Sequence, residues 1–154
     1  MPLGISNPVQ AHPTDKTLAR MMRGVISKVA DKAVSYGPPN GDIKLRTLIA
    51  LRYQENGTRL SPDDILITNG AQEALAIALQ SVATKGDIIA VESPTFFGIL
   101  ELIESLGMKA LELYSCSEDG VCIEEMQKSL VQYDVKACIF SSVINNPLGS
   151  KMTN

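Results

Sequence analysis

The feature that most constrains the fold is a regular alternation of short apolar runs and amphipathic helical patterns after residue 57. Runs predicted to be buried strands lie at 65–67, 88–91, 110–113 and 137–140. Patterns predicted to be helices lie between them, at 71–83, 97–106 and 123–131. Strands that alternate with helices in this way form parallel sheets covered by helices. We therefore predict an α/β fold with a mostly parallel sheet flanked by helices.

The residues before this alternation have a different pattern. The Pro-rich segment 1–13 is predicted to be an extended arm, followed by a helix over 14–34 that begins at Thr14 and Asp15. The apolar face of this helix is predicted to comprise Leu18, Met21, Met22, Val25 and Ile26. "SYGPPNGD" (35–42) is predicted to be a loop, because its prolines and glycines interrupt regular structure. Asp42 should begin a second helix that ends near Asn56.

Composition excludes several classes of protein. A net charge of −3 and a pI near 5.1 argue against general binding to nucleic acids or anionic membranes. The chain contains no apolar run of membrane-spanning length and does not start with a signal peptide. Its three cysteines have no CxxC spacing and are interpreted as reduced thiols of a cytoplasmic protein, with Cys138 in the core of a strand. The single histidine, His12, excludes a histidine metal cluster and a Ser-His-Asp triad within the chain. We predict no metal site.

"ITNGAQEALAIAL" (67–79) places small polar residues between a predicted strand and a strongly periodic helix. The N–H groups at a helix start lack partners within the helix, and the helix dipole adds positive potential there. The turn around Gly70 therefore suits an anion, above all a phosphate. The simpler alternative is an ordinary strand-to-helix turn that uses glycine for its geometry.

Two further clusters follow predicted strands, "ESPTFFG" (92–98) and "VINNPLG" (143–149). Each has a simple structural explanation: one of the two phenylalanines can pack the next helix, and an Asn-Pro pair can form a turn. Ligands bind parallel sheets at the carboxyl ends of the strands, where all three clusters fall. Together they predict a pocket with an anion cradle, an aromatic plate and an amide donor, which suits a flat phosphorylated heteroaromatic molecule.

These motifs resemble the class I/II aminotransferases, a family that depends on pyridoxal 5'-phosphate (PLP). The matching segments, in family order, are "YGPPNGDIKLR" (36–46), "ITNGAQEAL" (67–75), "VESPTFFG" (91–98) and "NNPLG" (145–149). Within the family, "AVESPTFFGILELIESLGMKALEL" (90–113) is most similar to the aminotransferase-like domain of MocR-type GntR regulators. Those regulators join a winged-helix DNA-binding domain to this domain. The resemblance implies an N-terminal arm, helix and interface loop over 1–41 and part of the PLP-binding large domain over 42–154.

The resemblance also implies a role for individual residues toward the PLP phosphate. Gly70, Ala71 and Gln72 would present backbone N–H groups to the phosphate, and Gln72 would add its side-chain amide. Tyr36 would reach the phosphate bound by a neighbouring subunit, because family members build each site across a homodimer interface.

Two other positions would contact the ring of the cofactor. Phe96, the second residue after Pro94, would stack on the pyridine ring. Asn146, immediately before Pro147, would donate to the phenolic oxygen and stabilise its anionic form.

The same resemblance implies that parts of the site lie outside this chain. The family attaches PLP to a lysine well beyond the Asn-Pro motif, and the aspartate and arginine that complete the site also come later. Lys151 follows the motif too closely and is interpreted as a solvated loop lysine. We therefore expect a fragment without catalytic residues of its own, with weak or no PLP binding and no DNA binding, since the winged helix is absent.

Three hypotheses about the complete protein remain open at this point. It is a MocR-type regulator that senses PLP or an amino-acid or amine ligand, a free-standing aminotransferase, or a Rossmann-like domain without a role for PLP. The last is disfavoured because no GxGxxG follows any predicted strand. A winged helix encoded upstream of Met1 would distinguish the first from the second.

Overall fold

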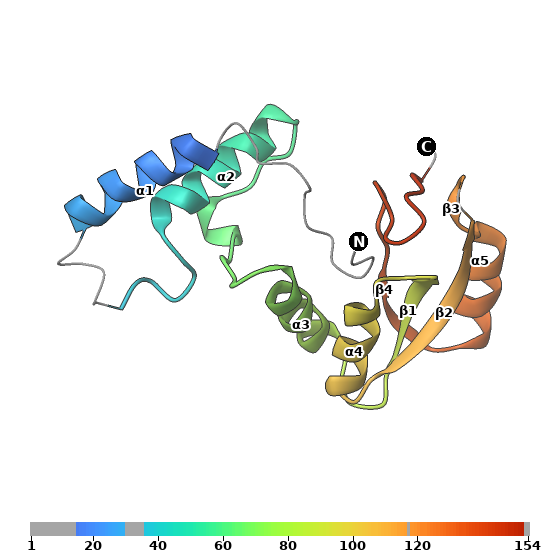
Figure 1. Ribbon diagram of the computed structural model, residues 1–154. Coiled ribbons are helices and arrows are strands. Elements are labelled where there is room, and N and C mark those ends of the chain that lie inside the picture. Colours follow the sequence, from blue (N-terminus) through green and yellow to red (C-terminus); the bar gives the residue numbers. More distant parts are fainter. Residues whose placement is uncertain (1–14, 30–35, 117, 153–154) are drawn as a thin grey trace. The chain divides into compact units, whose positions relative to one another are not determined.

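The computed structural model describes residues 15–29, 36–116 and 118–152 of the chain, which divides into two compact units, 1–66 and 67–154 (Figure 1). His12 and Thr14, and the part of the predicted 14–34 helix over 30–34, lie outside the described residues. None of the helices in the described part is long and apolar enough to cross a membrane.

The N-terminal unit is helical. It contains α1 (Asp15–Val29), α2 (Ile43–Glu55) and the short 3₁₀ helix η1 (Pro62–Asp64). As predicted, Asp42 caps α2: its side chain accepts hydrogen bonds from the backbone N–H groups of Lys44 and Leu45, at 2.9 and 3.0 Å.

Arg46 of α2 connects this helix to the loop before it and to η1. Its side chain is 5% exposed. The guanidinium donates to the carbonyl of Pro62 at 2.6 Å and to that of Gly41 at 3.2 Å, and it pairs with Asp63 at 3.2 Å. One buried cation thus joins the 36–42 loop, α2 and η1.

The C-terminal unit is a four-stranded sheet with helices on both faces, which confirms the predicted fold class. Its elements are α3 (Ala71–Val82), β1 (Ile88–Ser93), α4 (Phe97–Ser105), β2 (Lys109–Cys116), β3 (Gly120–Val121), α5 (Ile123–Gln132) and β4 (Val135–Ile139). The strand order is β3-β2-β1-β4. β1 pairs in parallel with both β2 and β4, and β3 pairs antiparallel with β2. The sheet is therefore mostly parallel.

Alternate residues of β1 divide the core between the two faces of this sheet. Ile89 and Val91 pack with Leu79 of α3 and Ile103 of α4. Ala90 faces the other way and packs in a second cluster, with Leu113, Val121 and Met126 of α5. This alternation is the period of two expected of a strand. It produces the three layers seen in Figure 1, with α3 and α4 on one side and α5 on the other.

Two sequence predictions about the strands are wrong. Residues 65–67 form no strand, and Leu66 is 50% exposed. A strand needs a neighbouring backbone to bond with, and no described strand lies beside this segment. Cys138 is in β4 as expected but is exposed rather than in the core, because β4 is an edge strand of the described sheet. What burial it has raises the pKa of its thiol. All three cysteines are free.

Candidate functional site

The start of α3 has the geometry expected of an anion cradle. Gly70 has φ +114°, in the region that favours glycine, and is the N-cap residue of α3 without a side-chain cap. Ala71 and Gln72 form the first turn, whose N–H groups have no partners within the helix. Thr68 stabilises the turn by donating from its hydroxyl to the carbonyl of Gly70 at 3.0 Å.

Glu73 is part of this turn and was not assigned a role from the sequence. Its carboxylate accepts hydrogen bonds from the backbone N–H and the side-chain amide of Asn69, at 2.5 and 3.1 Å. It therefore fixes the residues that lead into the helix. Its negative charge also lies in the first turn of α3 and opposes the positive potential there. The cradle must bind an anion through hydrogen bonds more than through net charge.

The motifs "ITNGAQEALAIAL" (67–79) and "ESPTFFG" (92–98) come together at Gly98. A Cβ atom placed on Gly98 would lie 2.5 Å from Cε1 of Phe96 and 2.8 Å from Nε2 of Gln72. The two side chains therefore reach the same point, and only a glycine in the first turn of α4 leaves room for both. A shallow cleft of about 450 Å³ lies here. Its lining residues are Gln72, Phe96, Phe97, Gly98, Glu101, Leu102 and Ser105.

The two phenylalanines differ in how far they are buried. Phe96 is half-buried and is the N-cap residue of α4. Phe97 is 56% exposed, and the two ring centroids are 4.7 Å apart with the planes tilted by 53°. Gly98 was not singled out from the sequence, although a small residue directly after two aromatic residues at a helix start was a usable signal.

The third motif forms a tight turn after β4. Asn145 is 2% exposed; its side-chain oxygen accepts from the N–H of Leu148 at 3.2 Å, and its backbone N–H donates to Ser150 at 3.0 Å. Asn145 thus takes the turn-forming role, while Asn146 beside it is exposed. Since β1 and β4 are parallel neighbours, Asn146 and Phe96 both follow the carboxyl end of the sheet.

Tyr36 belongs to the N-terminal unit and is fully exposed. Lys151 is exposed, as expected of a solvated loop lysine. Its backbone forms an isolated antiparallel bridge with Val143. The roles assigned to Tyr36, Gly70, Ala71, Gln72, Phe96 and Asn146 remain predictions.

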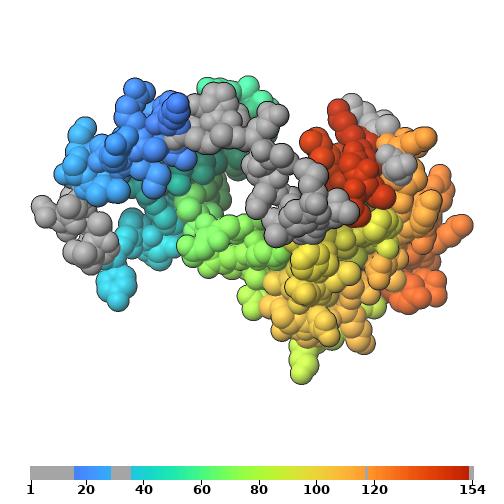
Figure 2. Space-filling model, in the orientation of Figure 1, coloured from blue at the N-terminus to red at the C-terminus, as the bar shows by residue number. Residues whose placement is uncertain are grey.

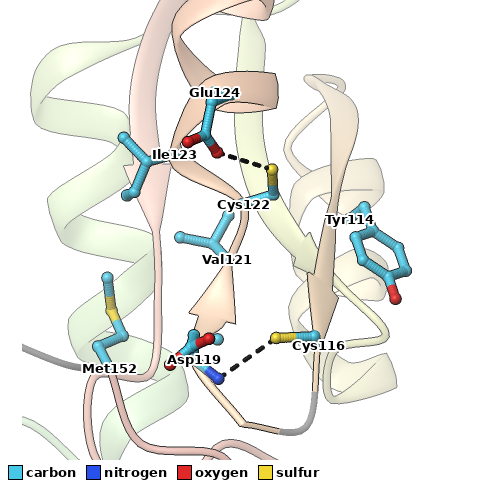
Figure 3. A pocket seen from close by; sticks show the side chains of 9 residues that line it. Tyr114, Cys116, Asp119, Val121, Cys122, Ile123, Glu124 and Met152 are labelled. Atoms are coloured by element: carbon cyan, nitrogen blue, oxygen red, sulfur yellow. Dashed lines mark hydrogen bonds between the residues drawn. The ribbon is translucent and has the colours of Figure 1, made fainter.

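A separate cavity of about 330 Å³ lies between the β2–β3 hairpin and the start of α5 (Figure 3). Cys116 and Cys122 line it. The N–H of Asp119 donates to Cys116 at 3.3 Å, and the Cys122 thiol donates to Glu124 at 3.3 Å. The pKa of Glu124 is lowered by its own backbone N–H and by this thiol. Within the described residues no group of three potential ligands is placed to hold a metal ion.

Sequence comparison decides the family. The model for "Aminotransferase class I and II" matches residues 1–154. This chain belongs to the class I and II aminotransferase family. The family is PLP-dependent, and the cradle at Gly70 and the convergence of Gln72 with Phe96 fit a phosphorylated ring compound.

Relatives of two kinds are found within this family. The HTH-type transcriptional regulators YdcR and YjiR of Escherichia coli are 38% and 33% identical over 88% and 97% of the chain. An aspartate/prephenate aminotransferase of Thermus thermophilus is 28% identical over 79% of the chain. The chain spans about a third of the length of each, namely 29%, 32% and 32%.

Solved structures agree with this assignment. A kynurenine aminotransferase of Pyrococcus horikoshii, in complex with PMP, is 28% identical with a TM-score of 0.78, over 91% of this chain and 36% of that one. An aromatic aminotransferase of the same organism has a TM-score of 0.80 at 24% identity, over 99% of this chain and 40% of that one, and supports the fold alone.

Proposed function

We propose that this chain is the phosphate- and ring-binding part of the aminotransferase-like, effector-sensing domain of a MocR-type regulator. The observation that carries the proposal is the agreement with two HTH-type regulators at 38% and 33% identity over nearly all of the chain. The free-standing aminotransferase is the second candidate. It is favoured by an aspartate aminotransferase of Thermotoga maritima that is 33% identical over a smaller share of the chain, 75%.

In either protein the described residues would hold PLP in the same way. Gly70, Ala71 and Gln72 would donate hydrogen bonds to its phosphate, Phe96 would cover one face of the ring, and Asn146 would donate to the phenolic oxygen. PLP supplies an electron sink for the chemistry of an amino group when it is bound. The contribution of these residues is to bind and orient the ring and to exclude water from one face.

Assembly with a second copy is part of the proposal. The apolar face of α1 is formed by Leu18, Met21, Met22, Val25 and Ile26, each between 55% and 63% exposed. An apolar stripe of this size on a helix marks an interaction surface. We propose that it contributes to a homodimer, in which Tyr36 reaches the partner's phosphate site.

The cradle can be tested by titrating the isotope-labelled chain with inorganic phosphate and with PLP. We expect both to shift the backbone N–H resonances of residues 70–72, and phosphate to do so without a covalent bond. Gly70→Ala forces an L-residue into φ +114° and should abolish the shifts. Gly86→Ala is a matched control, because Gly86 also has positive φ (+95°) and open space around it. Shifts that persist in Gly70→Ala would refute the cradle.

The regulator and the enzyme are distinguished by the complete gene. A winged-helix segment encoded upstream supports the regulator. A gene that encodes only an aminotransferase fold would exclude it.

A further inference from the structure

Glu92 is a carboxylate buried at the end of β1, with 1% of its surface exposed. Burying a charged group is costly unless hydrogen bonds compensate. One oxygen of Glu92 accepts a hydrogen bond from the backbone N–H of Ser141 at 2.6 Å, and the two residues are 49 positions apart in the sequence. The other oxygen has no partner among the described residues.

This hydrogen bond lies just beyond the end of the backbone pairing between β1 and β4. The ladder between β1 and β4 stops at the pair Val91 and Ile139. Glu92 is the next residue after Val91, and Ser141 is the second residue after Ile139. A side-chain hydrogen bond therefore continues the link between these two segments after their backbone pairing has ended. The link lies between two of the motifs: Phe96 follows Glu92 by four residues, and Asn146 follows Ser141 by five.

The segment 141–152 that begins at this bond is held as one unit. Met152 N–H donates to the carbonyl of Ser142 at 3.0 Å, Val143 pairs with Lys151, and Asn145 N–H donates to Ser150 at 3.0 Å. Asn146 lies in the turn that these contacts close. A shift at Ser141 therefore moves Asn146 with the whole segment, which is coloured red at the surface of the C-terminal unit in Figure 2.

Other buried polar groups accompany Glu92. The Ser115 hydroxyl, 3% exposed, follows by two residues Leu113, the β2 partner of Glu92, and so shares its sheet face. The Asn145 amide, 2% exposed, comes from the segment itself. The Ser115 oxygen and the Asn145 side-chain nitrogen have no partner among the described residues. A core built only for hydrophobic burial would have apolar side chains at these positions. We therefore interpret these polar side chains as groups that fix the position of the backbone after β4.

We propose that Glu92 is a positioning residue that fixes the 141–152 segment, and with it Asn146, relative to the loop that carries Phe96. The part that concerns Asn146 as a donor to PLP rests on the proposed function. The part that concerns the position of the segment does not.

The test compares Glu92→Gln with Glu92→Met in the full chain. Both side chains match the length of glutamate, but only glutamine keeps an oxygen that accepts from Ser141. We expect hydrogen exchange at the N–H groups of Asn145, Gly149 and Met152 to rise about tenfold or more in Glu92→Met. Exchange should stay near the wild-type rate in Glu92→Gln and, in both variants, in the core of β1. Glu112→Met is the control, since the carboxylate of Glu112 is exposed and accepts a hydrogen bond from the hydroxyl of Ser93, at 2.6 Å, rather than from the 141–152 segment.

A second measurement does not depend on whether Glu92→Met folds. The amide proton of Ser141 should move upfield in Glu92→Gln, because a neutral oxygen is a weaker acceptor than a carboxylate. An unchanged Ser141 resonance, or wild-type protection of 141–152 in a folded Glu92→Met, would overturn the proposal.

Adding PLP separates this inference from the proposed function. If both hold, Glu92→Met weakens PLP binding and Glu92→Gln restores it. If no variant binds PLP or phosphate but the exchange pattern appears, the proposed function fails and the positioning role stands. If PLP binds and exchange at 141–152 is indifferent to Glu92, the positioning role fails alone.

Discussion

Gly98→Ala is the sharpest perturbation of the candidate site. The new methyl group would lie 2.5 Å from the Phe96 ring and 2.8 Å from the Gln72 amide, distances that atoms do not adopt without displacement. Overpacking of this kind costs about 1–3 kcal/mol. Replacing glycine by alanine within a helix stabilises the folded state by up to about 1 kcal/mol, because alanine has the higher helix propensity. The net expectation is a loss of about 0–3 kcal/mol in the free energy of unfolding, with Phe96 and Gln72 pushed apart.

The measurement is urea-induced unfolding of the full chain, together with the resonances of the Phe96 ring and the Gln72 amide. Gly24→Ala in α1 is the control for helix propensity, because among the described residues no atom outside the neighbouring backbone of its own helix lies within 4 Å of its Cβ position. Gly24→Ala should be neutral or slightly stabilising. In a Phe96→Ala background, the cost of Gly98→Ala should fall, because the closest clash is gone.

Two results would refute this reasoning. A Gly98→Ala variant that is about 1 kcal/mol more stable than the wild type would show that the position behaves as an open helix site. Unchanged Phe96 and Gln72 resonances would show that the two side chains do not meet there. PLP or phosphate binding should weaken in the same variant if the site is the one proposed.

Three further predictions concern stability and association. Arg46→Met removes the hydrogen bonds to the carbonyls of Pro62 and Gly41 and the ion pair with Asp63, and should lower the free energy of unfolding by about 1–3 kcal/mol in urea titrations, whereas an unchanged midpoint would contradict the network. The backbone N–H of Thr84 lowers the pKa of Asp87, so its stabilisation is present above the unfolded pKa and is lost as the pH falls through the folded one; the stability deficit of Asp87→Asn should therefore shrink from pH 7 to strongly acid pH. The exposed edge of β4 and the apolar groove between β4 and α3 should make the chain dimerise or aggregate, and a monodisperse monomer in sedimentation at micromolar concentration would count against this.

Periodicity was enough to predict the elements that bury one clear face. Helices α3, α4 and α5 begin at the predicted residues, and β1 and β4 cover most of the predicted runs, because each has an apolar pattern that matches its own period. Asp42 was predictable for a different reason: its carboxylate satisfies N–H groups only two and three residues away, so no tertiary information is needed.

The errors have a common physical cause. Residues 65–67 have the composition of a strand, but a strand exists only when another backbone lies beside it, and composition does not report a partner. Cys138 was placed in the core because β4 is apolar, yet the outer edge of the last described strand remains uncovered. In both cases the missing information is which chain lies next to the segment.

Polar contacts between residues far apart in the sequence could not be predicted from the sequence either. The bond between Glu92 and Ser141 spans 49 residues, and nothing in "ESPTFFG" indicates that its glutamate is buried. The meeting of Gln72 with Phe96 likewise depends on how α3 and α4 pack. A resemblance to a family predicts which residues matter, whereas the structure shows which of them are neighbours.

The polar end of the sheet argues for a site independently of any relative. Parallel strands bring their carboxyl ends to one edge, so Glu92 and the segment after β4 must meet there whatever the sequence. A fold selected for stability alone would fill that edge with apolar side chains, since a buried carboxylate and a buried amide each cost free energy when an atom stays unpaired. This chain instead buries Glu92, Ser115 and Asn145 there and leaves Asn146 exposed beside them. Natural proteins break local rules of stability where function requires it. The free-energy cost of these buried polar groups is concentrated at the end of the sheet, before the segments that carry Phe96 and Asn146. The proposed cofactor would lie at this end.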